Sequence, residues 1–245
     1  MRTKLHRIFL SDLHLDDPIC DTFLRFDECL KIESERADEI YILGDLVEMW
    51  IGDDDESDLA CALKKVLRET SARCSVNLMH GNRDFLFGES FCRSAGVTLL
   101  EDPYKIDGHI LLSHGDSLCT DDGEYQAARK LFRDPSWQND ILQKSLQERE
   151  MLGKALRAQS VEANANKSSN IMDVNLNAID EFLKSHRADF LIHGHTHRPG
   201  HYSNRIVTGS WDTNGWLCRQ ENDQFQLECF SLATHYGNEN PGQLS

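Results

Sequence analysis

The chain has 245 residues, 40% of them hydrophobic and 27% charged, with a formal net charge of −15 at pH 7. This length is enough for a full hydrophobic core, and no stretch approaches the roughly 20 apolar residues of a membrane-spanning helix or the apolar run of a secretory signal, so we expect no export. The negative charge disfavours a long footprint on nucleic-acid phosphates, and we expect no nucleic-acid partner.

Predicted strands and helices alternate along most of the chain. Short apolar runs predict strands at Arg7–Ser11, Glu39–Leu43, Ser75–Met79, His109–Ser113, Phe190–Ile192, Arg205–Thr208, Leu217–Arg219 and Gln224–Phe230. Helices are predicted at about Ile19–Ser34, Ser57–Glu69, Glu89–Ser94 and Val174–Ser185. The alternation indicates an α/β fold of sheets flanked by helices, and the close succession of the last strands indicates mixed sheets.

Residues 124–170 interrupt this alternation and predict a helical insertion. The segment carries eight Lys/Arg and six Asp/Glu, which makes it +2 and leaves −17 on the rest of the chain. Leu142, Leu146, Met151, Leu152 and Leu156 give it an apolar side that we expect to pack on the core. We therefore expect one domain over residues 1–245 with this insertion as a lid, and a frayed polar tail from residue 238.

The eight cysteines contain no Cys-x-x-Cys pair and no zinc-ribbon spacing. This usage favours reduced thiols in a cytoplasmic enzyme over a disulfide framework.

Five predicted strands end in side chains that bind divalent metals well. In chain order these are Asp12, His14, Asp45, Asn82, His114, His195 and His197. Neighbouring strands lie only about 4.8 Å apart, and their carboxyl ends form the usual ligand crevice of an open α/β sheet. One Asp-x-His or Gly-Asn pair is usually accidental, but five in order, each after a strand, predict a metal centre.

The spacing also indicates how the centre is built. Asp12 and His14 project to one side, and His195 and His197 repeat that arrangement. Asp45 is placed to bridge two ions, because a carboxylate has two oxygens. Gly44, Gly81 and Gly194 stand where backbone must approach closely. Oxygen and imidazole ligands without thiolate suit Mn²⁺ or a similar ion, and two such ions can activate water for phosphoester hydrolysis. The neighbouring His80 and His193 are expected to be structural.

The ordered motifs D-x-H, GD, GN, a strand-terminal His and GHTH resemble those of the calcineurin-like metallophosphoesterases. The stretches ILGDLVEMWIGDDD, HGNRDFL, SHGDSLCTDD, ANANKSSNIMDVN and IHGHTHRP are similar to the UDP-2,3-diacylglucosamine hydrolases of lipid A biosynthesis. The resemblance runs from about Ile8 to Trp211. It implies a layered sandwich of mixed sheets flanked by helices, with a helical lid.

The resemblance also implies an activity: hydrolysis of the pyrophosphate of UDP-2,3-diacylglucosamine to UMP and lipid X. It implies two Mn²⁺ ions, one held by Asp12, His14, Asp45 and His197 and the other by Asp45, Asn82, His114 and His195. The implied substrate contacts are Asn82, Arg83, Asp122, Ser160, Asn164, Lys167 and His195. The enzyme would lie on the cytoplasmic face of the inner membrane as a peripheral protein, with no obligate protein partner.

Arg157, Ser160, Asn164 and Lys167 are spaced by three, four and three residues. On a helix they form one polar stripe about 80° wide. Spacing alone favours a solvated helix face, or a loop from residue 164 on, whereas the resemblance favours substrate binding.

Arg83 follows the GN motif where many metallophosphoesterases carry a histidine. We expect it to act with Asn82 and Asp45 in catalysis by neutralising phosphoryl charge, because a guanidinium is a poor general acid. A leaving group that departs without a proton, such as a sugar phosphate, fits this residue.

Three alternatives remain open. Phosphoprotein phosphatases and dinucleoside-polyphosphate hydrolases typically read GD-x-HG and GNHE where this chain reads SDLH and GNRD. A catalytically inactive scaffold would usually lack ligands, whereas all seven are present. A nucleic-acid phosphodiesterase is disfavoured by the −17 charge outside the insertion.

Overall fold

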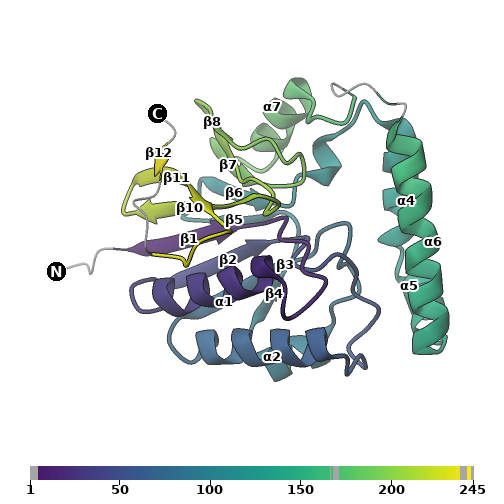
Figure 1. Ribbon diagram of the computed structural model, residues 1–245. Coiled ribbons are helices and arrows are strands. Elements are labelled where there is room, and N and C mark those ends of the chain that lie inside the picture. Colours follow the sequence, from purple (N-terminus) through teal and green to yellow (C-terminus); the bar gives the residue numbers. More distant parts are fainter. Residues whose placement is uncertain (1–4, 166, 168–170, 238–241, 244–245) are drawn as a thin grey trace.

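Two mixed β-sheets face each other at the centre of the computed structural model, which describes residues 5–165, 167, 171–237 and 242–243 (Figure 1). The seven-stranded sheet has the order β12 (Gly242–Gln243), β11 (Gln224–Ser231), β10 (Asn214–Glu221), β1 (His6–Leu10), β2 (Glu39–Leu43), β3 (Ser75–Met79) and β4 (Thr98–Leu100). The five-stranded sheet has the order β5 (Tyr104–Ile106), β6 (Ile110–Ser113), β7 (Phe190–His193), β9 (Arg205–Val207) and β8 (Gly200–His201).

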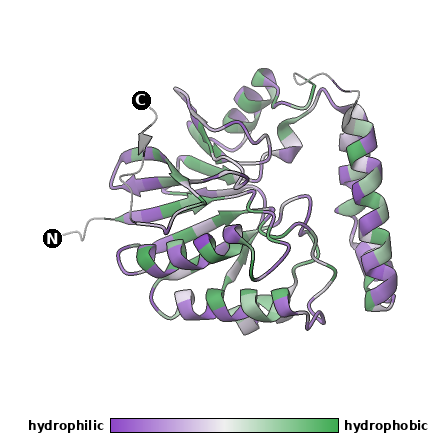
Figure 2. Ribbon diagram, viewed as in Figure 1, coloured by the Kyte–Doolittle hydropathy of each residue, from purple (hydrophilic) through white to green (hydrophobic). Residues whose placement is uncertain are grey.

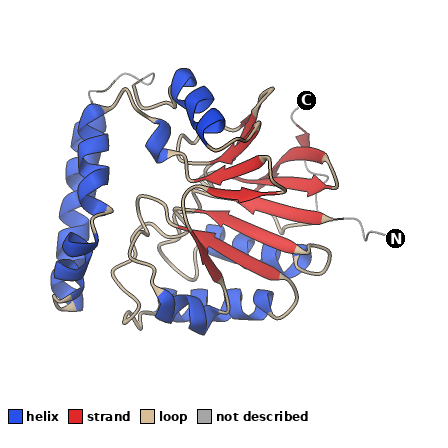
Figure 3. Cartoon of the chain, turned by 180° about the vertical axis from the view of Figure 1, so that it is seen from behind, coloured by secondary structure: helices blue, strands red, loops and turns tan. Residues whose placement is uncertain are grey.

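Helices cover the outer face of each sheet (Figures 1 and 3). Helices α1 (Asp21–Glu33), α2 (Asp58–Ser71) and α3 (Glu89–Ala95) share one apolar cluster with the seven-stranded sheet. Helix α7 (Leu176–Ser185) packs Ile179 and Leu183 against Leu111 and Leu191 of the five-stranded sheet. The expected α/β sandwich of mixed sheets flanked by helices is confirmed.

Successive side chains along a strand lie alternately in the two layers of the core, under the helices and between the sheets. In β1, Ile8 and Leu10 lie in the cluster under the helices, whereas Phe9 lies in the cluster between the sheets. In β6, Leu112 faces the other sheet and Leu111 faces α7. Because successive strand residues point to opposite faces, strands buried on both sides are apolar throughout, as their sequences are.

Beside the sandwich stand three helices, α4 (Gly123–Phe132), α5 (Pro135–Leu142) and α6 (Leu146–Ala165), in the region predicted to be a helical insertion (Figures 1 and 3). Polar and apolar residues are mixed along these helices (Figure 2). The predicted apolar side is partly wrong, because Leu142, Leu146 and Met151 are exposed, while Leu152 and Leu156 line a cavity beneath the helices. Among the described helices, none combines the length and apolar character needed to span a membrane.

The eight strands and four helices predicted from periodicity are confirmed, with ends shifted by up to three residues. The short strands β4, β5, β8 and β12 were not predicted, because two or three residues carry too little periodic pattern. All eight cysteines are unpaired, as expected. Apart from residues 242–243, the tail predicted to fray lies outside the described residues.

Candidate metal centre and substrate cavity

The expected metal ligands meet where the loops after β1 and β2 pair with each other. The backbone N–H of Asp12 donates to Gly44 O at 3.1 Å, and that of His14 donates to Asp45 O at 3.0 Å. In the five-stranded sheet, β6 and β7 are parallel neighbours, which brings the loops carrying His114 and His195 together. Parallel pairing therefore gathers ligands that lie far apart in the sequence.

Sharp backbone turns aim these side chains. Five of the seven expected ligands have positive φ angles, namely Asp12 (55°), His14 (50°), Asp45 (52°), His195 (68°) and His197 (56°). Non-glycine residues rarely adopt this left-handed conformation, and asparagine, aspartate and histidine tolerate it best. Such strained turns cluster at functional sites, where the surrounding structure holds them.

Asp12, His14 and His197 form the first candidate metal group, with ligand atoms within 4.8 Å of one another. The two imidazole Nε2 atoms of His14 and His197 face each other at 3.2 Å, and His197 Nε2 lies 3.5 Å from Asp12 Oδ1. Asp45 stands between this group and the next: its Oδ2 is 3.8 Å from His14 Nε2, and its Oδ1 is 3.8 Å from His114 Nε2. This placement is the one expected of a bridging carboxylate.

Asp12, Asp45 and His114 form a second candidate metal group. His114 donates its Nδ1 proton to Leu43 O at 2.9 Å, which leaves Nε2 facing the cluster. Asn82 Oδ1 lies 3.0 Å from that Nε2. Asp12 thus belongs to both groups, whereas the sequence assigned it to one ion only.

His195 reaches this second group through Asn82, because its Nδ1 lies 2.8 Å from Asn82 Oδ1. Its backbone N–H also donates to Asp12 Oδ2 at 2.9 Å. All seven residues expected to be ligands are therefore gathered into one cluster.

Gly44 shows how closely the loops approach. Its φ is +89°, and a Cβ atom placed there would lie 2.6 Å from Gly81 Cα and 2.6 Å from His114 Nδ1. Only glycine fits where loops from β2, β3 and β6 meet.

The cluster holds surplus negative charge. Burial and the charge of Asp45 raise the pKa of Asp84 to about 6. Burial lowers the pKa of His114, but Asp45 and Asp12 more than offset this and raise it to about 9. Burial raises the pKa of Asp12 too, yet its hydrogen bond to His197 and the neighbouring imidazoles bring it well below its usual range.

The donor set fits divalent cations. Carboxylate, amide and imidazole atoms converge without thiolate, and their surplus negative charge is what bound cations would neutralise. Asp12, His14 and His197 would hold one cation, Asn82, His114 and His195 the other, and Asp45 both.

Residues near the ligands fix the loops. His80 Nε2 donates to Phe87 O at 2.8 Å and His193 Nδ1 to Gly194 O at 3.0 Å, so both expected structural histidines have backbone partners. Asp84 accepts from Gly81 N and Leu46 N, at 2.6 and 2.7 Å, and so ties together the loops that carry Asn82 and Asp45. The sequence did not reveal this role.

Side chains of α4 and of its C-terminal end contact two of the loops that carry candidate metal ligands. Arg129 forms an ion pair with Asp116 at 2.8 Å, and the Tyr125 hydroxyl donates to the same carboxylate at 3.1 Å. Arg133 donates to Gly81 O at 3.0 Å, next to Asn82. Sequence reasoning missed Tyr125, Arg129 and Arg133, since nothing in a helical pattern shows which loop a side chain will reach.

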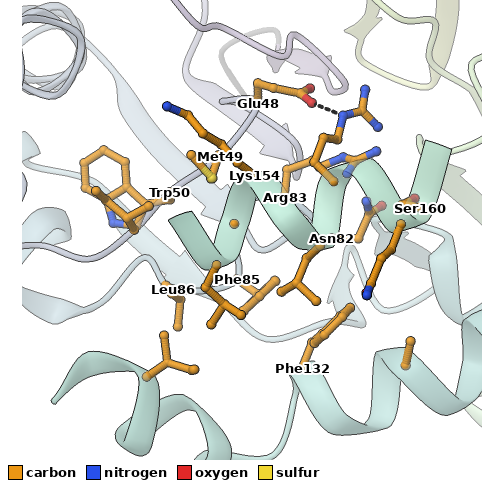
Figure 4. A pocket seen from close by; sticks show the side chains of 18 of the residues that line it. Glu48, Met49, Trp50, Asn82, Arg83, Phe85, Leu86, Phe132, Lys154 and Ser160 are labelled. Carbon is orange, nitrogen blue, oxygen red and sulfur yellow. Dashed lines mark ion pairs between the residues drawn. The ribbon is translucent and has the colours of Figure 1, made fainter. Parts of the chain in front are cut away.

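A cavity of about 440 Å³ lies between the core and the three helices, and Figure 4 shows it from close by. Asn82 and Arg83 line it, so the cavity adjoins the metal centre. Away from them its walls are mainly apolar, with Phe85 and Phe132 stacked at 5.6 Å between ring centroids. The arrangement joins an end that carries Asn82 and Arg83, next to the candidate metal ligands, to an apolar chamber.

The predicted substrate residues are only partly gathered here. Arg83, Arg157, Ser160 and Lys167 line the cavity together with Asn82. Asp122 instead caps α4 and accepts from Lys167 Nζ at 2.8 Å, and His195 lies in the metal cluster. Helix α6 ends at Ala165, so Lys167 lies beyond it, and the side chain of Asn164 is outside the described residues.

Fold and site together define a metal-dependent phosphoesterase, and the model of the calcineurin-like phosphoesterase family matches residues 5–199. The chain is 43% identical to the UDP-2,3-diacylglucosamine hydrolase of Chromohalobacter salexigens, over 88% of this chain and 93% of that protein. It is 40% identical to the UDP-2,3-diacylglucosamine hydrolase of Salmonella typhi, over 92% and 99% of the two chains. The chain belongs to the UDP-2,3-diacylglucosamine hydrolase family of calcineurin-like phosphoesterases, and is a metal-dependent hydrolase.

Proposed function

We propose that this enzyme hydrolyses the pyrophosphate bond of UDP-2,3-diacylglucosamine, releasing UMP and 2,3-diacylglucosamine 1-phosphate. The observation that carries the proposal is the apolar cavity that begins at the metal centre, at Asn82 and Arg83. A diphosphate beside Arg83 and bound metal ions would leave its acyl chains to fill the chamber between core and helices. A hydrophilic phosphomonoester would leave that chamber empty.

We assign two Mn²⁺ ions to the cluster, where Asp45 would contribute to holding both. Such ions, when bound, lower the pKa of the attacking water and neutralise charge on the phosphoryl oxygens. Asn82 and His195, whose Oδ1 and Nδ1 atoms lie 2.8 Å apart, would contact the phosphoryl group from neighbouring loops.

Arg83 supplies the remaining positive charge. Its backbone N–H donates to Asp45 Oδ1 at 2.8 Å, which holds the residue against the cluster, and its Nε is a buried donor with no partner among the described residues. A guanidinium with a pKa above about 12 stabilises anionic oxygens but protonates nothing. A sugar phosphate leaves without a proton, because its second pKa is about 6, whereas a serine alkoxide does not.

Arg157 and Ser160 on α6, and Lys167 just beyond its end, line the cavity and would contact the substrate, with Asp122 holding Lys167 in place. The family resemblance adds Asn164 to these contacts. We place the enzyme on the cytoplasmic face of the inner membrane, as a peripheral protein without an obligate partner. Exposed Leu131, Leu142, Leu146 and Met151 on the three helices support contact with a lipid surface.

The test is UMP release by purified protein, first stripped of metal by a chelator and then supplied with Mn²⁺. We expect Mn²⁺-dependent release from UDP-2,3-diacylglucosamine and little from UDP-N-acetylglucosamine, which lacks the long acyl chains. Equal rates on the two substrates would favour the alternative of a general nucleotide pyrophosphatase. No release with both metals bound would favour an inactive scaffold.

A further inference from the structure

Helix α6 docks on the loop that follows β2. Arg149 is buried although it is charged: it donates to Ile51 O at 2.6 Å and pairs with Asp54. One turn further along, Gly153 lies so close to Met49 that a side chain there would collide with it. Residues four apart lie on one helix face, so a single face of α6 rests on this loop.

Arg157 lies on the same face of α6, one turn further along, and contacts Glu48. Its Nε pairs with Glu48 Oε1, the ion pair drawn as a dashed line in Figure 4. The other oxygen, Glu48 Oε2, lies 3.0 Å from His14 Nδ1, close but not aligned as a hydrogen bond. One carboxylate thus contacts the helix with one oxygen and a metal-centre histidine with the other.

Backbone pairing, and not the helix, sets the position of Glu48. Its N–H donates to Leu15 O at 3.0 Å, and the N–H of Leu15 donates to Leu46 O at 3.0 Å. These bonds continue the pairing that joins His14 to Asp45. The backbone of Glu48 therefore stays beside His14 whether or not α6 is docked, and what docking adds is the guanidinium of Arg157 against the side-chain carboxylate.

A carboxylate beside Nδ1 of a ligating histidine keeps the proton on that nitrogen and leaves Nε2 for the metal. His14 Nε2 faces His197 Nε2 and Asp45 Oδ2. Arg157 restrains the same carboxylate from the other side, and Glu48 is about one quarter exposed, so without Arg157 it is free to turn toward water. We propose that Glu48 is a positioning residue that couples the docking of α6 to the orientation of His14 in the metal centre. The inference rests on the proposed function only in naming His14 as a metal ligand.

The test uses Mn²⁺ alone, without substrate, on the full chain. Mn²⁺ affinity is measured from the electron paramagnetic resonance signal of the free ion, and amide hydrogen exchange is followed in peptides of α6. In the wild type we expect Mn²⁺ to slow exchange in α6. Glu48→Gln should weaken binding of one Mn²⁺ by roughly 10- to 100-fold and abolish that slowing.

Arg157→Gln is the second variant, because its partly exposed side chain can be replaced without harming the fold. We expect faster exchange in α6 and a smaller loss of Mn²⁺ affinity, since coupling between two sites is reciprocal. The matched control is Glu150→Gln, which also removes one glutamate charge but breaks only an i,i+4 pair with Lys154. It should leave both readouts unchanged.

The proposal would be overturned if Glu48→Gln bound Mn²⁺ with wild-type affinity. It would also be overturned if Mn²⁺ did not slow amide exchange of α6 in the wild type, or if it still slowed that exchange in Glu48→Gln. Neither result would touch the proposed function, which depends on UMP release. Conversely, failure to release UMP would leave this metal-only coupling standing.

Discussion

Replacing Gly44 by alanine tests whether three loops really meet at the metal centre. The position combines a φ of +89° with 2.6 Å approaches to Gly81 and His114. Two other glycines separate these effects. Gly108, in the turn between β5 and β6, has a φ of +77° but open space around it, and Gly123, at the start of α4, has open space and no positive φ.

The magnitudes follow from these differences. A left-handed alanine costs about 1–2 kcal/mol, which is the whole cost expected for Gly108→Ala. Gly44→Ala adds overpacking of about 1–3 kcal/mol, so we expect a loss of about 2–5 kcal/mol in the free energy of unfolding. Gly123→Ala should be neutral or stabilise by up to about 1 kcal/mol, because alanine favours the helix.

Urea denaturation of metal-free protein measures all three values. Mn²⁺ binding adds a second readout: only Gly44→Ala should weaken it, since the new methyl group must displace His114 or the loop before Asn82. If Gly44→Ala is no more destabilising than Gly108→Ala and binds Mn²⁺ normally, the close approach of these loops is wrong.

Three further predictions concern the site and the core. Asp45→Ala should disturb both ions and lower turnover by orders of magnitude with the fold retained, as metal analysis, circular dichroism and UMP release would show; two bound ions and near-normal turnover would refute the bridging role. Arg83→Ala should lose most activity on UDP-2,3-diacylglucosamine, and Arg83→His should not restore it; full activity in either, or efficient cleavage of phosphoserine peptides by the wild type, would contradict the leaving-group argument. Burial raises the pKa of Glu33, but its ion pair with Arg219 lowers the pKa by more and holds it below the usual 4.5. The ion pair therefore stabilises the fold above pH 4.5, and this stabilisation is lost as the pH falls through the lower pKa of the folded state. Glu33→Gln should therefore cost about 3 kcal/mol at pH 7 and progressively less in acid, whereas a cost independent of pH in urea denaturation would refute the assignment.

The gathering of the candidate ligands could be predicted from sequence because it depends on local pattern. Each ligand directly follows an apolar run, and parallel strands bring their carboxyl ends together whatever the details of packing. Asp12, Asp45 and His114 therefore needed no knowledge of loop structure to be expected in one place. That Asp12 belongs to both candidate groups was beyond reach, because it depends on ångström-scale distances set by left-handed turns and by glycines such as Gly44.

Contacts between the core and helices α4, α5 and α6 could not be predicted from the sequence in this way. Arg149 and Asp54 are 95 residues apart, and neither stands in a pattern that points to the other. Glu48 lies only three residues after Asp45 in GDLVE, yet its contact with His14 depends on pairing between two loops and its contact with Arg157 on where α6 docks.

The sequence by itself determined the alternation of strands and helices, the gathering of seven ligands at strand ends, and the interruption by a helical segment. These features follow from side-chain periodicity and chain direction, which act over a few residues. Only the tertiary structure decided which face of α6 meets the loop after β2, which side chains line the cavity, and which carboxylates support the ligands. Those choices arise from packing between segments distant in the chain, where many arrangements satisfy the same local pattern and only the complete set of contacts selects one.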